Sequence, residues 1–209
     1  MLNIIIIYLK RSFQIYMPKV ETFNKELVLK QAIEVFHDKG YNATSMQDLV
    51  DATGLNRSSI YNSFDSKLNL FILCLKAYNE EFMSQLLNDM NNANNALHTI
   101  ETLLNLYMDL IFKDEKDKGC LITNCTSEMA NQEPSITKFL KSNQESFLAF
   151  LEEIIIKGQQ DSLINKKQTP KAYALYLFSS FQGFRTTGIL IPNKNDMKQI
   201  SKTIIQTLI

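Results

Sequence analysis

The side chains best suited to catalysis and metal binding are few in this sequence and lie far apart. The 209 residues include two histidines, His37 and His98, and three cysteines, Cys74, Cys120 and Cys125. Their spacing matches neither a zinc-ligand pattern nor a disulfide scaffold. Neither histidine belongs to an evident catalytic constellation, and the sequence has no glycine-rich phosphate loop. We therefore predict no enzymatic activity, no metal and no cofactor, and the cysteine usage fits a reducing cytoplasm.

A short polar run after Gly54 carries the other chemistry that the sequence offers, which is recognition of DNA. An arginine such as Arg57 can bind guanine through two hydrogen bonds or hold a phosphate, and an asparagine such as Asn62 can pair with adenine. The first residues of a helix that enters the major groove lie near the base edges. The residues predicted to face the bases are Asn56, Arg57, Ser58, Ser59 and Asn62.

The elements that must position this run are helices. Glycine and proline number only 6 and 4, where average usage predicts roughly 25 in a chain of this length. Apolar residues at helical spacing from Asn24 to Lys39 predict a first helix that Gly40 ends. A capping box of Thr44 and Gln47 predicts a second helix to about Thr53. Gly54 then forms a turn, and Asn56 caps a third helix through Phe64, which together make a helix-turn-helix pattern.

The rest of the chain also has helical periodicity. A long stripe of apolar residues after Asp65 and Ser66, either of which can cap, predicts a helix to Met90. Thr169 and Pro170 open a nearly all-apolar helix to about Leu190, which Pro192 ends. The other predicted helices span about 96–113, 120–131, 134–158 and 195–208. The fold class is therefore all-α, with a domain boundary near residue 66.

Residues 1–16 form an extension of ambiguous origin. The apolar run 2–9 is too short to span a membrane, which needs about 20 residues, and its charges follow the run, unlike those of a signal peptide. Met17 offers a second plausible start. The extension is either the product of a misassigned start or a native segment, and we predict no membrane partner.

The run from Gly40 to Phe71 closely resembles the DNA-binding domain of the TetR/AcrR family of bacterial transcriptional regulators. It covers about a quarter of the chain. The matching residues are Gly40, Tyr41, Thr44, Ala52, Gly54, Ile60, Tyr61, Phe64, Lys67, Leu70 and Phe71. The resemblance implies a three-helix DNA-binding domain at 17–66 and a helical effector-binding and dimerisation domain at 67–209.

The resemblance also implies which side chains hold the phosphate backbone. Thr44, Ser45, Tyr61 and Lys67 match family positions with that role, which hydroxyls and helix N-termini can fill without net charge. The sequence departs from a basic DNA-binding domain, since residues 17–70 carry six basic and seven acidic side chains. We therefore expect moderate, salt-sensitive affinity for double-stranded operator DNA. A plain helical core unit without DNA contacts is the alternative.

The C-terminal part is expected to bind an effector and a second copy of the chain. The helices 170–190 and 195–208 resemble the family's two-helix contribution to a homodimeric bundle, and a merely buried helix is the alternative. Arg185 could pair with a ligand anion, with a carboxylate such as Glu128, or with solvent. Aromatic and methionine side chains of the middle helices could line an apolar chamber for an unknown small molecule, although each could equally be plain core. The candidate ligand-binding residues are Tyr107, Phe112, Cys120, Asn124, Met129, Phe147, Phe181 and Arg185.

The sequence around Cys120 supports a second reading. Gly119, Cys120, Leu121 and Asn124 resemble a motif in one branch of the family, in which the cysteine of some members senses electrophiles or oxidants. A helix N-terminus favours the reactive thiolate. Three functions result: a repressor released by a small molecule, as is the family's habit, a thiol-based sensor acting through Cys120, and a helical protein-interaction module that does not bind DNA.

Overall fold

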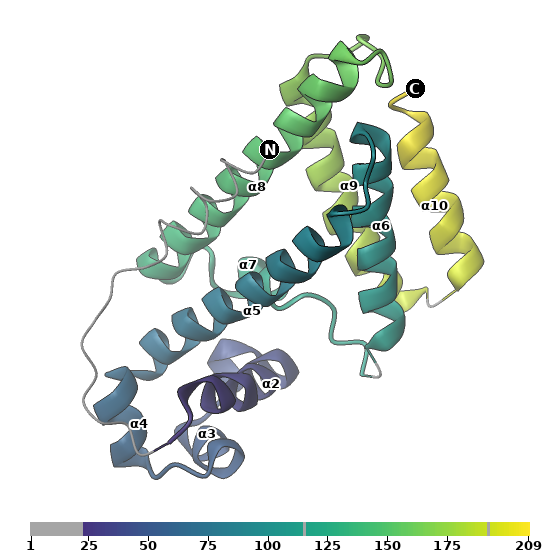
Figure 1. Cartoon of the computed structure of the whole chain (residues 1–209). Coiled ribbons are helices and arrows are strands. Elements are labelled where there is room, and N and C mark those ends of the chain that lie inside the picture. Colours follow the sequence, from purple (N-terminus) through teal and green to yellow (C-terminus); the bar gives the residue numbers. More distant parts are fainter. Residues whose placement is uncertain (1–22, 115, 192) are drawn as a thin grey trace.

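The computed structural model describes residues 23–114, 116–191 and 193–209, so the extension 1–16, Met17 and Pro192 lie outside the described residues. The described residues form nine α-helices and no strand, which confirms the all-α prediction (Figure 1). None of these helices is long and apolar enough to cross a membrane. The helices are α2 (Lys25–Ala43), α3 (Met46–Thr53), α4 (Arg57–Phe64), α5 (Lys67–Met90), α6 (Ala96–Lys113), α7 (Leu121–Met129), α8 (Pro134–Gln160), α9 (Pro170–Leu190) and α10 (Lys194–Gln206).

The helix-turn-helix forms as predicted, but its capping box is shifted by one residue. Ser45, not Thr44, caps α3: its hydroxyl accepts from the Asp48 amide at 3.1 Å, and the Asp48 carboxylate accepts from the Ser45 amide at 2.8 Å. The Gln47 side chain instead bonds Asp51. Gly54 ends α3 in the left-handed region (φ 68°), where a residue without Cβ carries no steric penalty. Asn56 caps α4 as predicted, by accepting from the Ser59 amide at 2.8 Å.

A kink near the end of α2 explains the shift. Gly40 has φ 76° and ψ 174° inside the helix, so the last turn of α2 is displaced from the axis of the preceding turns. Thr44 lies inside the resulting corner, only 1% exposed, and its hydroxyl donates to the Gly40 carbonyl at 2.6 Å. Because the Thr44 hydroxyl is already bonded to Gly40 inside the corner, it is not free to cap α3. The exposed Ser45 caps the helix in its place.

Two buried cores share the helices α5 and α8. The N-terminal core includes Phe36 of α2, Leu49 of α3 and Ile60 of α4, packed against the first half of α5. It also takes in Leu121 of α7 and Ile136 at the start of α8. The C-terminal core lies among the second half of α5, α6, the rest of α8, α9 and α10. The helix-turn-helix unit therefore packs directly on α5 and α7, with no linker between (Figure 1).

Helix α9 is covered on more than one side, as its nearly all-apolar sequence requires. Tyr173, Leu177, Phe181 and Phe184 are buried against α6, α8 and α10. One stripe of α9 stays exposed, with Leu175 at 44% and Leu190 at 83%. The smaller members of that stripe are Ser179, Gly183 and Thr186.

Candidate nucleic-acid interface and effector chamber

The exposed face of α4 carries the residues predicted to read DNA. Ile60 and Phe64 are buried on its inner face, which turns Arg57, Ser58 and Asn62 outward, all exposed. Ser59 is half-buried, and the Asn56 side-chain oxygen is committed to capping. The face therefore presents a guanidinium, a hydroxyl and an amide at the start of a two-turn helix, the groups that bind base edges and phosphates.

The four residues expected to contact phosphates differ in how exposed their side chains are. Tyr61 is 43% exposed, and Ser45 is exposed at the start of α3. Lys67 is half-buried, with its ammonium 4.4 Å from the centroid of the Tyr41 ring, and burial lowers its pKa. Thr44 is the exception, because burial and its bond to Gly40 prevent its hydroxyl from facing a phosphate in this structure.

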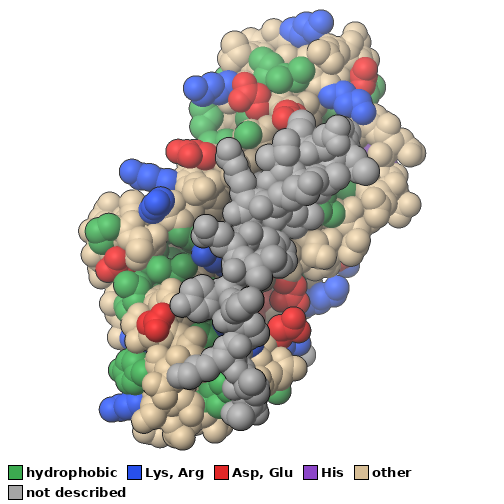
Figure 2. All heavy atoms as spheres, turned by 60° about the vertical axis from the view of Figure 1, so that its left-hand side comes forward, with side chains coloured by type: hydrophobic (Ala, Val, Ile, Leu, Met, Phe, Trp, Pro, Cys, Tyr) green, Lys and Arg blue, Asp and Glu red, His purple; other side chains and the backbone are tan. Residues whose placement is uncertain are grey.

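The charges of this unit offset each other. Lys39 pairs with Asp48 at 2.7 Å, and together with the Ser45 hydrogen bonds it lowers the pKa of Asp48 to about 2. On the surface visible in Figure 2, Lys and Arg side chains are scattered among Asp and Glu side chains. Attraction to DNA must therefore come from local contacts and not from a broad positive field.

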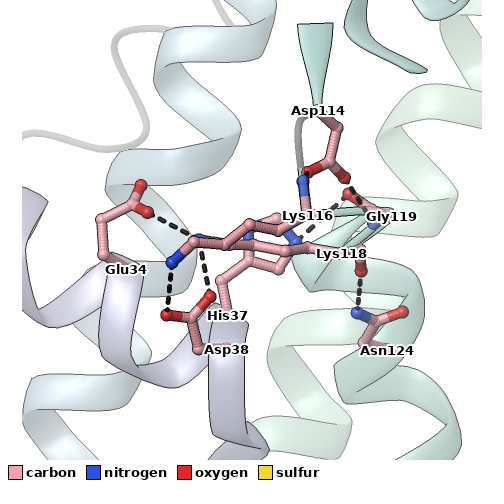
Figure 3. A network of polar contacts seen from close by, with 8 residues as sticks. All are labelled: Glu34, His37, Asp38, Asp114, Lys116, Lys118, Gly119 and Asn124. Carbon is pink, nitrogen blue, oxygen red and sulfur yellow. Dashed lines mark hydrogen bonds and ion pairs between the residues drawn. The ribbon is translucent and has the colours of Figure 1, made fainter. Parts of the chain in front are cut away.

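A polar clamp joins α2 to the segment before α7 (Figure 3). The Lys118 ammonium, 11% exposed, lies 2.7 Å from carboxylate oxygens of both Glu34 and Asp38. The His37 Nε2–H donates to the Gly119 carbonyl at 3.2 Å. We call these five residues the α2 clamp. A hollow of about 510 Å³ lies beside them.

Glu128 of α7 makes a second junction with α2. Its carboxylate accepts from the Tyr41 amide at 2.9 Å and from the Asn42 amide at 2.7 Å. These are donors that the kink at Gly40 leaves without helical partners. A Cβ at Gly40 would lie 2.8 Å from a Glu128 oxygen, so glycine is required for this contact. Glu128 is therefore not the partner of Arg185, which corrects one reading of the sequence.

The surroundings of the clamp histidine favour its neutral form. Burial is the largest cause that lowers the pKa of His37 below its ordinary 6.5, and the nearby Lys118 cation lowers it further. Asp114, Glu34 and the bond to Gly119 oppose these effects only in part. His98, by contrast, accepts from the Asn94 amide at 3.3 Å, at the start of α6.

Four of the predicted ligand-binding residues meet in or beside the C-terminal core. The rings of Tyr107 and Phe147 flank Phe181, with centroids 5.4 and 6.5 Å away. The Arg185 guanidinium lies 5.0 Å from the Tyr107 centroid. Arg185 therefore lies against one end of an aromatic cluster, in contact with rings of α5 and α6.

Cys120 lies at the edge of this group. It is 4% exposed, and its sulfur, as the cap of α7, accepts from the Thr123 amide at 3.5 Å. Burial alone would lower the pKa of Arg185, but Cys120, Tyr78 and Tyr107 outweigh it and raise that pKa. Cys74 and Cys125 are buried thiols, and burial raises the pKa of Cys125 to about 12.

The other predicted ligand residues lie elsewhere. Phe112 is 39% exposed near the end of α6, under Lys194. Met129 belongs to the N-terminal core. The Asn124 amide donates to the Lys118 carbonyl at 2.8 Å and so braces the α2 clamp. The fold therefore places these three residues outside the aromatic cluster beside Arg185.

Sequence reasoning missed Glu34, Lys118 and Tyr78. Glu34 and Asp38 are four residues apart and share one face of α2, a spacing that marks an acidic stripe without naming its partner. Tyr78 was predicted only as part of an apolar stripe, yet its hydroxyl accepts from Arg185 at 3.3 Å. Burial, the largest effect, raises the pKa of Tyr78 to about 12.

Comparison with known proteins agrees with this architecture. Residues 28–74 match the model of bacterial regulatory proteins of the tetR family, and residues 96–204 match the tetracyclin repressor-like C-terminal domain. The HTH-type transcriptional regulator YezE of Bacillus subtilis is 26% identical over 165 residues, covering 78% of this chain and 85% of that protein. The HTH-type transcriptional repressor DhaR of Mycobacterium sp. is 22% identical over 185 residues, covering 88% and 92%.

A solved structure shares the fold. It is a cysteine mutant of the TetR family transcriptional regulator CifR complexed with 26 bp of operator DNA, with a TM-score of 0.76 at 19% identity, covering 90% of this chain and 98% of that one. Fold and site together define a helix-turn-helix transcriptional regulator. The chain belongs to the TetR family of bacterial regulatory proteins.

Proposed function

We propose that this protein is a homodimeric repressor that binds a palindromic operator and is released by a small-molecule effector. The single observation that carries the proposal is the outward face of α4, where Arg57, Ser58 and Asn62 stand exposed on a helix held by a buried inner face. Its relative DhaR is named a repressor, and the similar fold of CifR is complexed with operator DNA. The protein acts in the cytoplasm by binding and not by catalysis.

In this proposal Arg57 and Asn62 read bases, while Ser45, Tyr61 and Lys67 hold phosphates. The exposure of Tyr61 and Ser45 supports those roles. Asn56 and Ser59 form the N-terminal cap of α4, and their remaining polar atoms contribute to the contacts with DNA. Sequence ranges 17–66 and 67–209 are the DNA-binding and the effector-binding parts.

Dimerisation uses the open stripe of α9 together with α10. Ser179, Gly183 and Thr186 are small and exposed, and nothing lies within 4 Å of a Cβ built at Gly183. A stripe of small residues between Leu175 and Leu190 lets a second α9 approach closely and bury both leucines. One recognition helix reads few base pairs, so two copies on half-sites about one DNA turn apart supply the specificity.

Effector binding is transmitted to α4 through the α2 clamp. Gly119 and Cys120 adjoin both the aromatic group around Arg185 and the clamp residues Lys118 and His37. A ligand that displaces this segment would shift α2 and, through the shared N-terminal core, α4. The usual coupling between two such sites is ~1 to 3 kcal/mol.

A thiol-sensing function of Cys120 is the second candidate, favoured by the position of this cysteine as the N-cap of α7. Because Cys120 is only 4% exposed, an electrophile reaches its sulfur only when the surrounding packing opens. In that case Cys120→Ala would retain DNA that the wild-type protein releases on electrophile treatment. Equal release by both proteins would exclude the thiol mechanism.

Selection of bound duplexes from a random pool tests the main proposal. We expect enrichment of one inverted repeat, and a gel shift with that duplex that unlabelled operator competes away and scrambled sequence does not. Enrichment of nothing over the starting pool at low ionic strength would contradict DNA binding. A helical protein-interaction module would give that result.

A further inference from the structure

Arg185 is a cation without a carboxylate partner. Its guanidinium donates one hydrogen bond, to the Tyr78 hydroxyl at 3.3 Å, and lies over the rings of Tyr107 and Phe82 at 5.0 and 6.0 Å from their centroids. It forms no ion pair with any Asp or Glu among residues 23–114, 116–191 and 193–209. A guanidinium has five N–H donors, so most of its hydrogen-bonding capacity is unused by these neighbours.

The surroundings of Arg185 favour the binding of an anionic ligand. Moving a cation out of water is costly unless a counter-charge or hydrogen bonds replace the lost solvation. Aromatic faces and one phenol replace a part of it. No buried side-chain nitrogen in the described part of the chain lacks a partner, so the other Arg185 donors keep contact with solvent and are open to a ligand. A carboxylate can accept two parallel N–H bonds from a guanidinium, which is the strongest pairing available to this side chain.

The space beside Arg185 is small, and a carboxylate enters it only if a side chain of the lining moves. A narrow opening of about 20 Å³, room for about one water, is lined on its apolar side by Leu110, Ile111 and Ile189. The Ile111 side chain fills the hollow over Gly188, where an added Cβ would lie 2.6 Å from its Cδ1 atom. Rotation of that side chain about its χ angles would extend the opening onto the Gly188 backbone.

The remaining lining limits the charge of the ligand. Asp114 and Asp117 also border the opening. The Asp114 carboxylate is fixed by the Gly119 amide at 2.8 Å. These two carboxylates oppose the attraction of Arg185 for any anion, and they repel a dianion more strongly than a monoanion, so a singly charged ligand is the anion that this lining favours.

We infer that this opening is the effector subsite for a small organic monocarboxylate, whose carboxylate pairs with Arg185 and whose apolar body lies against Leu110, Ile111 and Ile189. The inference rests on the proposed function and names the effector's chemical class. Gly119 lines the opening and accepts the His37 hydrogen bond. An occupied subsite therefore presses on the segment that holds α2.

The test uses the full chain with acetate, butyrate, hexanoate and benzoate, and with the matched amides as neutral controls. We expect at least one carboxylate to raise the melting temperature with increasing concentration, and its amide and a dicarboxylate such as phthalate to have little effect. Isothermal titration then compares the wild type with Arg185→Gln. Loss of a charge-assisted pair predicts binding at least about tenfold weaker, while Lys157→Gln, an equal change of charge at an exposed position of α8, should bind the carboxylate normally.

Gly188→Ala provides a second variant, because its Cβ forces Ile111 into the opening and should weaken the same carboxylate while Arg185 stays in place. Equal stabilisation by acid and amide, unchanged affinity of Arg185→Gln, or no response to any carboxylate would overturn the subsite. Operator binding without ligand is measured in parallel. A protein that binds operator but ignores carboxylates refutes the subsite alone, whereas a protein that binds no duplex refutes the proposed function.

Discussion

Arg57 occupies the first turn of α4, exposed and, within the described part of the chain, in no ion pair with an acidic neighbour. Arg57→Ala is expected to weaken operator binding by about 1–3 kcal/mol, because a guanidinium on a base edge contributes that much. Fluorescence anisotropy at fixed salt measures the change. Lys157→Ala, which removes an exposed charge at the far end of α8, serves as control and should leave affinity nearly unchanged. Equal losses in the two variants would mean that Arg57 supplies only general charge.

His37 should make the protein less stable in mild acid. Its folded pKa lies below the ordinary 6.5, so the unfolded chain binds the proton more readily than the folded chain. The stability due to neutral His37 is fully present above 6.5 and is lost as the pH falls through the lowered folded pKa. Urea unfolding between about pH 7.5 and 5.5 should show a decline that is smaller in His37→Gln. Parallel curves for the two proteins would contradict this assignment.

At the scale of elements, caps and glycines made most helix boundaries predictable. Gly54, Asn56 and Thr169 act as the sequence indicated. The capping box was misplaced because Thr44 and Ser45 are each followed three residues later by a suitable partner, and only the kink at Gly40 decides between them. The α2 clamp joins residues about 80 positions apart, and local periodicity contains no information on such pairs.

Lys118 is the centre of the clamp, so its removal should loosen the junction between α2 and α7. Lys118→Met is expected to lower the free energy of unfolding by about 1 kcal/mol, since a largely enclosed ion pair of one lysine with two carboxylates exceeds an exposed one. Lys116→Met is the matched control, because Lys116 is 67% exposed with one contact at 3.3 Å. Urea denaturation compares both with wild type. A larger effect at Lys116 would disprove the clamp as described.

At the scale of the whole molecule, the open stripe of α9 predicts a dimer. Gly183→Gln places a long polar side chain where a monomer has free space, so it should leave helicity intact and give a monomer at micromolar concentration by light scattering. Gly183→Ala should remain dimeric and be up to ~1 kcal/mol more stable, owing to helix propensity. A Gly183→Gln protein that stays dimeric would place the interface elsewhere.

Footprinting tests in one experiment both the dimer and the spacing of its two recognition helices on DNA. Hydroxyl-radical footprinting on the selected operator should reveal two protected half-sites related by a two-fold axis, with centres about one helical turn, ~34 Å, apart. Protection of a single half-site, or uniform cleavage along the duplex, would contradict the binding of a dimer to a two-fold symmetric operator.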